Sequence, residues 1–266
     1  MYKKIYKYYP CSDYAFDSVK NNYFVFSCPF DFNDLIDCQI TIDSKTASLS
    51  PNKFIEKVIN ETFFDDPEYR DELKSKMVYE EAACEDLYNK KVIQQMIAQF
   101  RVSCFSMSSD NTLMWAHYAS NHQGFCLEFS YPDNQPNLFM YLSKINYTSQ
   151  YPVLTMPVFD ITDPDNEKQF EAMATTLLLT KQDVWSYEEE YRIILNGDFG
   201  EKIPGCRKNK IKYPAEALTG VYFGSHCADN TISTIYGYCV DNKNSSFYKL
   251  TPKKDRFGYN TIPLFC

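Results

Sequence analysis

Residues 102–129 read VSCFSMSSDNTLMWAHYASNHQGFCLEF, and this stretch decides the predicted fold. An apolar run at Val102–Met107 predicts a strand, Leu113–Ser120 has helical spacing, and Gly124–Phe129 predicts a second strand. Strands joined in this way by a short inserted helix favour a mixed or mainly antiparallel sheet over a regular alternation of parallel strands and crossover helices. The predicted class is therefore α+β.

The flanking sequence extends the same pattern. Strands are expected at Lys4–Tyr9 and Tyr23–Ser27, with a helix at Tyr14–Lys20 between them. Ser50-Pro51 opens a helical insert at about residues 50–100, because a hydroxyl cap followed by proline begins many helices. Later strands are expected at Tyr141–Tyr147, Tyr191–Leu195, Val221–Gly224 and Ser246–Leu250, and a later helix at Asp229–Tyr236.

Composition predicts one domain over residues 1–266, since 44% of the 266 residues are hydrophobic and 17% aromatic. The net charge of −8 opposes diffuse binding to nucleic acid or anionic membranes. Two basic stretches stand out locally, Lys202–Lys212 and Lys253–Arg256, which we interpret as solvated loops in preference to an anion-binding site. The N-terminal residues contain no apolar signal region, and no stretch is long enough to span a bilayer, so a cytoplasmic location is expected.

The densest group of chemically useful side chains lies in Trp185–Arg192, which reads WSYEEEYR. On a strand over Tyr187–Leu195, Glu188, Glu190 and Arg192 would share one face, with neighbours roughly 7 Å apart. One carboxylate would then pair with Arg192 while the other stays free to stabilise a cation or accept a proton. The flanking Trp185 adds an aromatic wall able to stack on a ring, and the alternative is a surface ladder of ion pairs.

A second group of candidate residues follows in Met114–Tyr118. Trp115, His117 and Tyr118 form an amphipathic cluster able to contact a base, ribose or phosphate, but the pattern favours Trp115 and Tyr118 as core anchors with His117 as a hydrogen-bonded neighbour. His117 and His122 lie about 140° apart around a helix, so they do not chelate one metal ion, and no metal site is predicted. Glu128 lies inside an apolar strand, so it is either on a solvated face or a buried carboxylate that needs a partner such as Arg101 or Arg192.

These motifs resemble a bacterial family catalogued as domain of unknown function 2971. The resemblance covers almost the whole chain, and the family name implies no activity. It rests on Tyr6-Lys7-Tyr8, Phe26-Ser27, Phe32-Asn33-Asp34, Cys104-Phe105-Ser106, Met114–Tyr118, His122–Phe129, Lys181 and Trp185–Arg192.

A more distant resemblance concerns chemistry, because Glu188-x-Glu190 after an aromatic turn is similar to the Glu-x-Glu element of ADP-ribosyltransferases. It implies that Glu190 contacts the nicotinamide ribose of NAD and supports an oxocarbenium-like transition state, while Glu188 helps to activate the acceptor. Ser106 would match the serine element of the second strand, and Trp115 or Tyr118 would pack near nicotinamide.

The chain departs from these transferases on its first strand. The family has an arginine or histidine there, whereas this chain has Lys7, Tyr8 and Tyr9. The resemblance therefore implies that contacts to the ribose or phosphates come from Lys181 or Arg192.

The resemblance implies an NAD-consuming ADP-ribosyltransferase-like protein that modifies a protein or nucleic acid, as a toxin or phage-defence effector. NAD would be the substrate, with no metal and no membrane partner, and no oligomeric state is predicted. Two alternatives stay open. One is a metal-dependent phosphodiesterase or nuclease that uses Asp34, Glu128, Glu188 and Glu190 as oxygen ligands. The other is a non-catalytic nucleotide- or peptide-binding module in which the aromatic residues and Arg192 bind the ligand and the glutamates only hold the arginine.

Overall fold

The computed structural model of the chain describes residues 2–34, 36–39, 41–43, 60, 67–76, 97–132, 137–155 and 172–264. The chain divides into two compact units. Unit 1 comprises Met1–Ser27, Arg101–Tyr147 and Asp183–Cys266, and unit 2 comprises Cys28–Phe100 and Thr148–Gln182. The expectation of one domain over the whole chain stays a prediction.

Unit 1 is built on an 11-stranded sheet of order β11-β12-β2-β4-β1-β5-β13-β14-β15, in which β10 also pairs with β4 and with β6. The sheet is mainly antiparallel, while β13 and β14 run parallel. The α+β class is thereby confirmed. The strands are β1 (Tyr2–Tyr9), β2 (Tyr23–Ser27), β4 (Phe100–Ser106), β5 (Phe125–Pro132), β6 (Leu142–Lys144), β10 (Glu190–Asn196), β11 (Glu201–Lys202), β12 (Lys208–Lys212), β13 (Leu218–Phe223), β14 (Ser246–Pro252) and β15 (Tyr259–Leu264).

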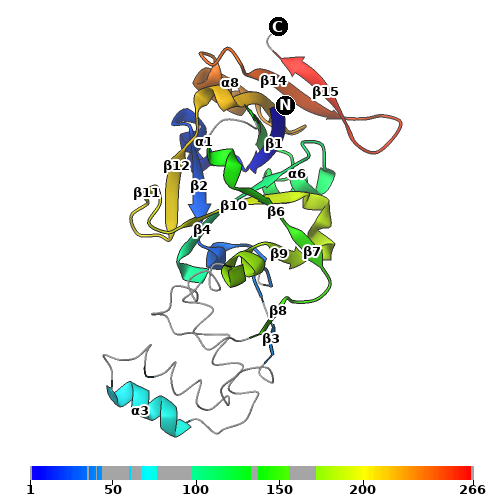
Figure 1. Ribbon diagram of the computed structural model, residues 1–266. Helices are drawn as coiled ribbons and strands as arrows, with labels where there is room; N and C mark the ends of the chain where they lie inside the picture. The colour runs from blue at the N-terminus through cyan, green and yellow to red at the C-terminus, as the bar shows by residue number, and fades with distance from the viewer. Residues whose placement is uncertain are drawn as a thin grey trace. The chain divides into compact units, whose positions relative to one another are not determined.

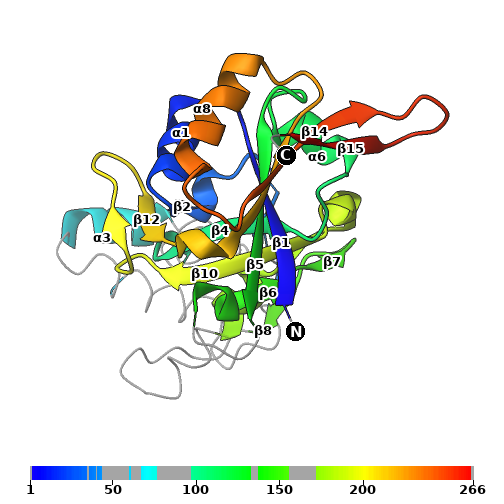
Figure 2. The ribbon, with the colours of Figure 1, turned by 90° about the horizontal axis from the view of Figure 1, so that it is seen from above.

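One face of this sheet carries the main hydrophobic core. The helices α1 (Asp13–Lys20) and α8 (Asp229–Cys239) lie side by side against it (Figure 2). Because side chains alternate along a strand, Phe125, Leu127 and Phe129 of β5 all point to this face and are fully buried. The core therefore follows directly from the alternation in the sequence.

The opposite face of β5 is covered by the short helix α6 (Thr112–Tyr118). Trp115 of α6 is fully buried against Cys126 and Leu250, and its ring packs edge-on to Tyr8 at 5.2 Å between centroids. Asn111 begins the helix, because its side-chain oxygen accepts hydrogen bonds from the backbone of Leu113 and Met114. Three 3₁₀ helices complete unit 1: η4 (Leu138–Tyr141), η5 (Asp183–Glu188) and η6 (Ala215–Ala217).

In unit 2 the described elements are fewer. Strands β3 (Thr41–Asp43) and β8 (Val153–Thr155) pair in parallel, and a helix over residues 172–178 buries Met173, Ala174, Leu177 and Leu178. The other elements are η1 (Pro29–Asp31), α3 (Pro67–Lys76) and β9 (Thr180–Gln182), and β7 (Asn146–Thr148) lies at the boundary between the units. Helix α3 falls within the predicted helical insert, much of which lies outside the described residues.

Most predicted elements of unit 1 are confirmed (Figure 1). The interpretation of Lys202–Lys212 as a solvated loop is wrong, because Lys208–Lys212 form β12, which pairs with β2. Lysine alternates there with Asn209 and Ile211, so Asn209 and Ile211 pack on one face of the strand while the lysine side chains extend toward solvent. Within the described residues, no helix combines the length and apolar character needed to cross a membrane.

Candidate functional site

The candidate site lies where η5 ends and β10 begins. Glu188 is the last residue of η5, and Glu190 is the first residue of β10. Between them Glu189 has a φ of 46°, a left-handed conformation that interrupts strand alternation. The prediction that Glu188 and Glu190 share one face of a continuous strand is therefore wrong.

Three successive carbonyl groups of this turn are held by the segment that links β4 to α6. Ser106 Oγ donates to the Glu188 carbonyl at 2.7 Å, and Met107 N donates to the Glu189 carbonyl at 3.2 Å. Asn111, which also caps α6, donates from its amide to the Tyr187 carbonyl at 2.8 Å. The backbone that carries both glutamates is thus fixed by residues from elsewhere in the sequence.

The Glu188 carboxylate points back toward α6. It is buried, and its Oε1 accepts a 2.5 Å hydrogen bond from the Tyr118 hydroxyl. The sequence thus pointed to two separate groups of candidate residues, and the structure brings Glu188 and Tyr118 into contact.

Glu190 and Arg192 form a buried ion pair on β10. Arg192 is fully buried and Glu190 is 3% exposed. Arg192 Nε lies 2.7 Å from Glu190 Oε1, and Nη2 donates to Oε2 at 3.3 Å. Two residues apart on a strand, both side chains point to the same face, as expected for this pair. The guanidinium therefore fixes the orientation of the carboxylate through both oxygens.

Lys7 of β1 adds a second cation to this part of unit 1. Its Nζ donates to Ser103 Oγ at 2.9 Å and to the Cys104 carbonyl at 2.8 Å. Burial lowers the pKa of Lys7 to about 8, although the nearby charge of Glu190 opposes the shift. Burial also raises the pKa of Cys104 above its usual range, and the charge of Glu190 adds to this effect. Cys104 is therefore a neutral thiol and no nucleophile at neutral pH.

Three rings gather near α6 and η5. His117 is exposed, and Trp185 and Tyr187 are half-buried. The His117 ring lies 6.4 Å from Trp185 and 6.5 Å from Tyr187, and Trp185 lies 5.9 Å from Tyr187. We call this group the aromatic platform. It presents ring surface on which a planar group can stack.

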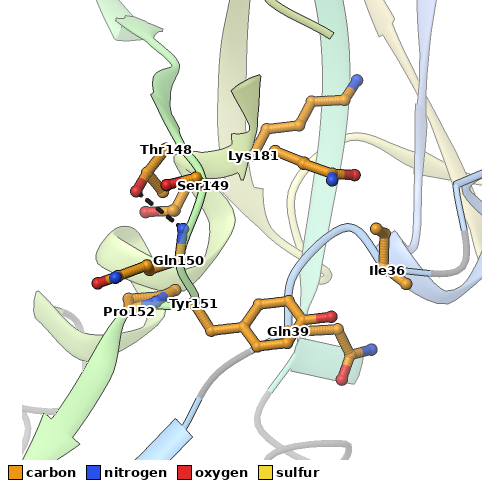
Figure 3. Close-up of a pocket in the computed structure, with 10 residues that line it drawn as sticks. Ile36, Gln39, Thr148, Ser149, Gln150, Tyr151, Pro152 and Lys181 are labelled. Carbon is orange, nitrogen blue, oxygen red and sulfur yellow. Dashed lines mark hydrogen bonds between the residues drawn. The ribbon is translucent and has the colours of Figure 1, made fainter. Parts of the chain in front are cut away.

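Trp115 and Lys181 were also offered by the sequence as ligand contacts. Trp115 has no exposed surface, and its indole N–H donates a hydrogen bond to the Ser109 carbonyl at 2.8 Å, so it is a core residue. Lys181 belongs to unit 2, where it lines a pocket of about 200 Å³ opposite the segment from Thr148 to Pro152 (Figure 3). Its Nζ lies 3.9 Å from Asp37 Oδ2.

Glu128 lies on the α6 side of the sheet in surroundings of its own. Its carboxylate contacts Lys4 Nζ at 3.0 Å and accepts from the hydroxyls of Thr219, Tyr222 and Tyr6. Burial raises its pKa, but the hydrogen bonds from Thr219, Lys4 and Tyr222 outweigh burial and hold the pKa below its usual range. The expectation of an arginine partner is wrong, because Lys4 and three hydroxyls satisfy this carboxylate.

Residues 114–193 match the model of a family described as a protein of unknown function, DUF2971. The matched segment runs from α6 to β10 and therefore contains Tyr118, Glu188, Glu190 and Arg192. It agrees with the resemblance found in the sequence, while the family description states no activity. No curated protein and no solved structure matches the chain.

Two residues that hold the site together, Asn111 and Lys7, lie outside residues 114–193, and the sequence analysis did not predict their contacts. Asn111 gave a signal, since an asparagine before an apolar helical run is a common cap. Its hydrogen bond to the Tyr187 carbonyl depends on tertiary structure, and no pattern in the sequence indicates it. Lys7 was noted in the Tyr6-Lys7-Tyr8 motif and as a departure from the transferase pattern, but its position beside Cys104 depends on the pairing of β1 with β4 and has no signal in the sequence.

Proposed function

We propose that the chain is an NAD-consuming ADP-ribosyltransferase-like protein. One observation carries the proposal: Glu190, Ser106 and Lys7, distant in sequence, come from β10, β4 and β1, and these strands pair in that order, while Glu188 ends η5 just before β10. The resemblance assigns the glutamate element and Ser106 to one substrate, and we add Lys7 because its strand β1 pairs with β4. The family match itself adds support only for the unknown-function family.

In the proposed reaction the bond between ribose and nicotinamide breaks, and nicotinamide leaves with the bonding electrons. The acceptor nucleophile forms the new bond to the ribose carbon and loses a proton to Glu188. Glu190 stabilises the positive charge that develops on the ribose, which needs a fixed carboxylate rather than a metal ion. Arg192 is a positioning residue here, because it holds that carboxylate through both oxygens.

Lys7 and the aromatic platform supply the other contacts in this proposal. Lys7 provides positive charge on the first strand, where the resemblance expects arginine or histidine. Trp185 and His117 provide the ring surface for nicotinamide or adenine, the role first expected of the buried Trp115. The ligand class is therefore a nucleotide with a planar ring.

The experiment is incubation of the purified chain with NAD labelled in the nicotinamide and in the adenine, in buffer and in bacterial lysate. Glu190→Gln is expected to abolish nicotinamide release, and Glu188→Gln to reduce transfer of ADP-ribose to an acceptor more than release. Glu189→Gln is the matched control, because Glu189 lies between them and is exposed.

Circular dichroism at the assay temperature establishes that each variant is folded. The proposal fails if the wild type releases no nicotinamide in either medium, or if folded Glu190→Gln releases it at the wild-type rate.

A second candidate function is a non-catalytic nucleotide-binding module. The observation that favours it is that both carboxylates are buried and engaged, Glu190 by Arg192 and Glu188 by Tyr118. In this case the glutamates only shape the site, and the aromatic platform binds the ligand. Calorimetry with ADP-ribose separates the two: binding lost in Trp185→Ala, together with no NAD turnover, favours the module.

A further inference from the structure

The hairpin formed by β14 and β15 ends in a basic tip with one fully exposed aromatic ring. Residues 253–258, which read KKDRFG, connect the two strands and are called the hairpin tip here. Phe257 is 104% exposed, more than any other large apolar side chain among the described residues. Figures 1 and 2 both show this hairpin extending beyond the neighbouring strands of unit 1. The ring is therefore accessible on all sides.

The tip is an ordered turn on a fixed base. The two strands pair up to Pro252 and Tyr259, and Lys253 N then donates to the Gly258 carbonyl at 3.0 Å. Gly258 has a φ of 114°, a conformation that side-chain-bearing residues rarely adopt. At the base, the Tyr259 hydroxyl lies 3.0 Å from His122 Nδ1, in a hydrogen bond that ties the hairpin to the turn after α6.

The hairpin tip carries a net positive charge. Lys253, Lys254 and Arg256 are opposed there only by Asp255. No described residue forms a hydrogen bond or ion pair with the side chains of Lys254 and Arg256, both of which are exposed. Because the whole chain carries a net charge of −8, this positive charge belongs to a local site and not to a diffuse surface.

We propose that the hairpin tip binds single-stranded nucleic acid. An exposed aromatic ring stacks on an unpaired base, and flanking cations contact the phosphates on either side, which is how proteins hold single strands. Phe257 supplies the ring, and Lys253, Lys254 and Arg256 supply the phosphate contacts. An anionic membrane fits less well, because the negative charge of the rest of the chain is repelled by an extended anionic surface. The proposal goes beyond NAD chemistry and requires none.

The test measures binding of the full-length chain, without NAD, to labelled single-stranded oligonucleotides of about 12 nucleotides by fluorescence anisotropy. Phe257→Ala is expected to weaken binding at least about fivefold, the loss of one stacked base. Lys254→Gln is expected to lower the slope of log affinity against log salt by about 0.7, the value for one phosphate contact on a single strand.

Phe199→Ala is the matched control. Phe199 is also exposed, at 58%, but lies between Asp198 and Glu201, so its removal should leave binding unchanged. Duplexes of the same sequence and vesicles containing phosphatidylserine are measured in parallel. The proposal is overturned by an absence of single-strand binding, by equal binding of Phe257→Ala, by duplex binding as tight as single-strand binding, or by Phe257-dependent binding to the vesicles alone.

Discussion

Replacing Arg192 by methionine should destabilise the fold strongly, because it leaves the Glu190 carboxylate buried without its cation. Arg192 is fully buried and Glu190 is 3% exposed, so water cannot replace the guanidinium. Removing one partner of a buried pair typically costs about 3–5 kcal/mol. With a urea dependence on the order of 3 kcal/mol/M for a chain of this size, the unfolding midpoint should fall by roughly 1–2 M.

The assay is urea unfolding followed by circular dichroism for Arg192→Met, Glu190→Gln and the double variant. The double variant should be more stable than the sum of the single losses predicts, with a coupling energy of about 1–3 kcal/mol. Arg256→Met is the matched control, because Arg256 is exposed, and its effect should stay within about 0.5 kcal/mol. A loss below about 1 kcal/mol for Arg192→Met, or strict additivity, would refute the reasoning.

Three further predictions concern single side chains near the site. Burial lowers the pKa of Lys7 from 10.5 to about 8. Between pH 8 and 10.5, Lys7 is therefore protonated in the unfolded chain and neutral in the folded chain. The free energy of unfolding of the wild type should therefore increase as pH rises from 8 to 10.5. In urea unfolding, Lys7→Met should remove this increase. A pH dependence of stability in Lys7→Met equal to that of the wild type would contradict the prediction. Tyr118→Phe removes a hydrogen bond to Glu188 and should cost about 1.5–3 kcal/mol in thermal unfolding, whereas Tyr238→Phe on the surface of α8 should cost almost nothing. Asn111→Ala should lower the free energy of unfolding by about 2 kcal/mol, because it removes both the helix cap and the hydrogen bond to Tyr187. Asn111→Asp keeps the cap and should cost about half as much. Equal losses in the two variants would disprove the dual role.

The strands of unit 1 were predictable wherever one buried face makes apolar residues alternate along the sequence. In β5, Phe125, Leu127 and Phe129 face the core, and that alternation is visible in the sequence. Strand β12 was missed because its lysines read as a charge run, although Ile211 and Asn209 are the residues that pack. Charge obscures an edge strand because long side chains can lie along a sheet and still reach water.

The candidate site was predictable in its location and only partly in its geometry. The segment Trp185–Arg192 carries the glutamates, the arginine and two rings, and sequence proximity alone finds it. The orientation of Glu188 was not predictable, because a left-handed conformation at Glu189 has no residue signature when the residue is not glycine. The contacts of Lys7 and Tyr118 depend on strand and helix packing between distant segments, which local patterns do not encode.

Nicotinamide release from NAD is the measurement that tests the proposed activity most directly. The account predicts release by the wild type and by Glu189→Gln, and none by folded Glu190→Gln. Release that continues unchanged in Glu190→Gln, or a wild type that releases no nicotinamide in buffer and in lysate, would contradict it.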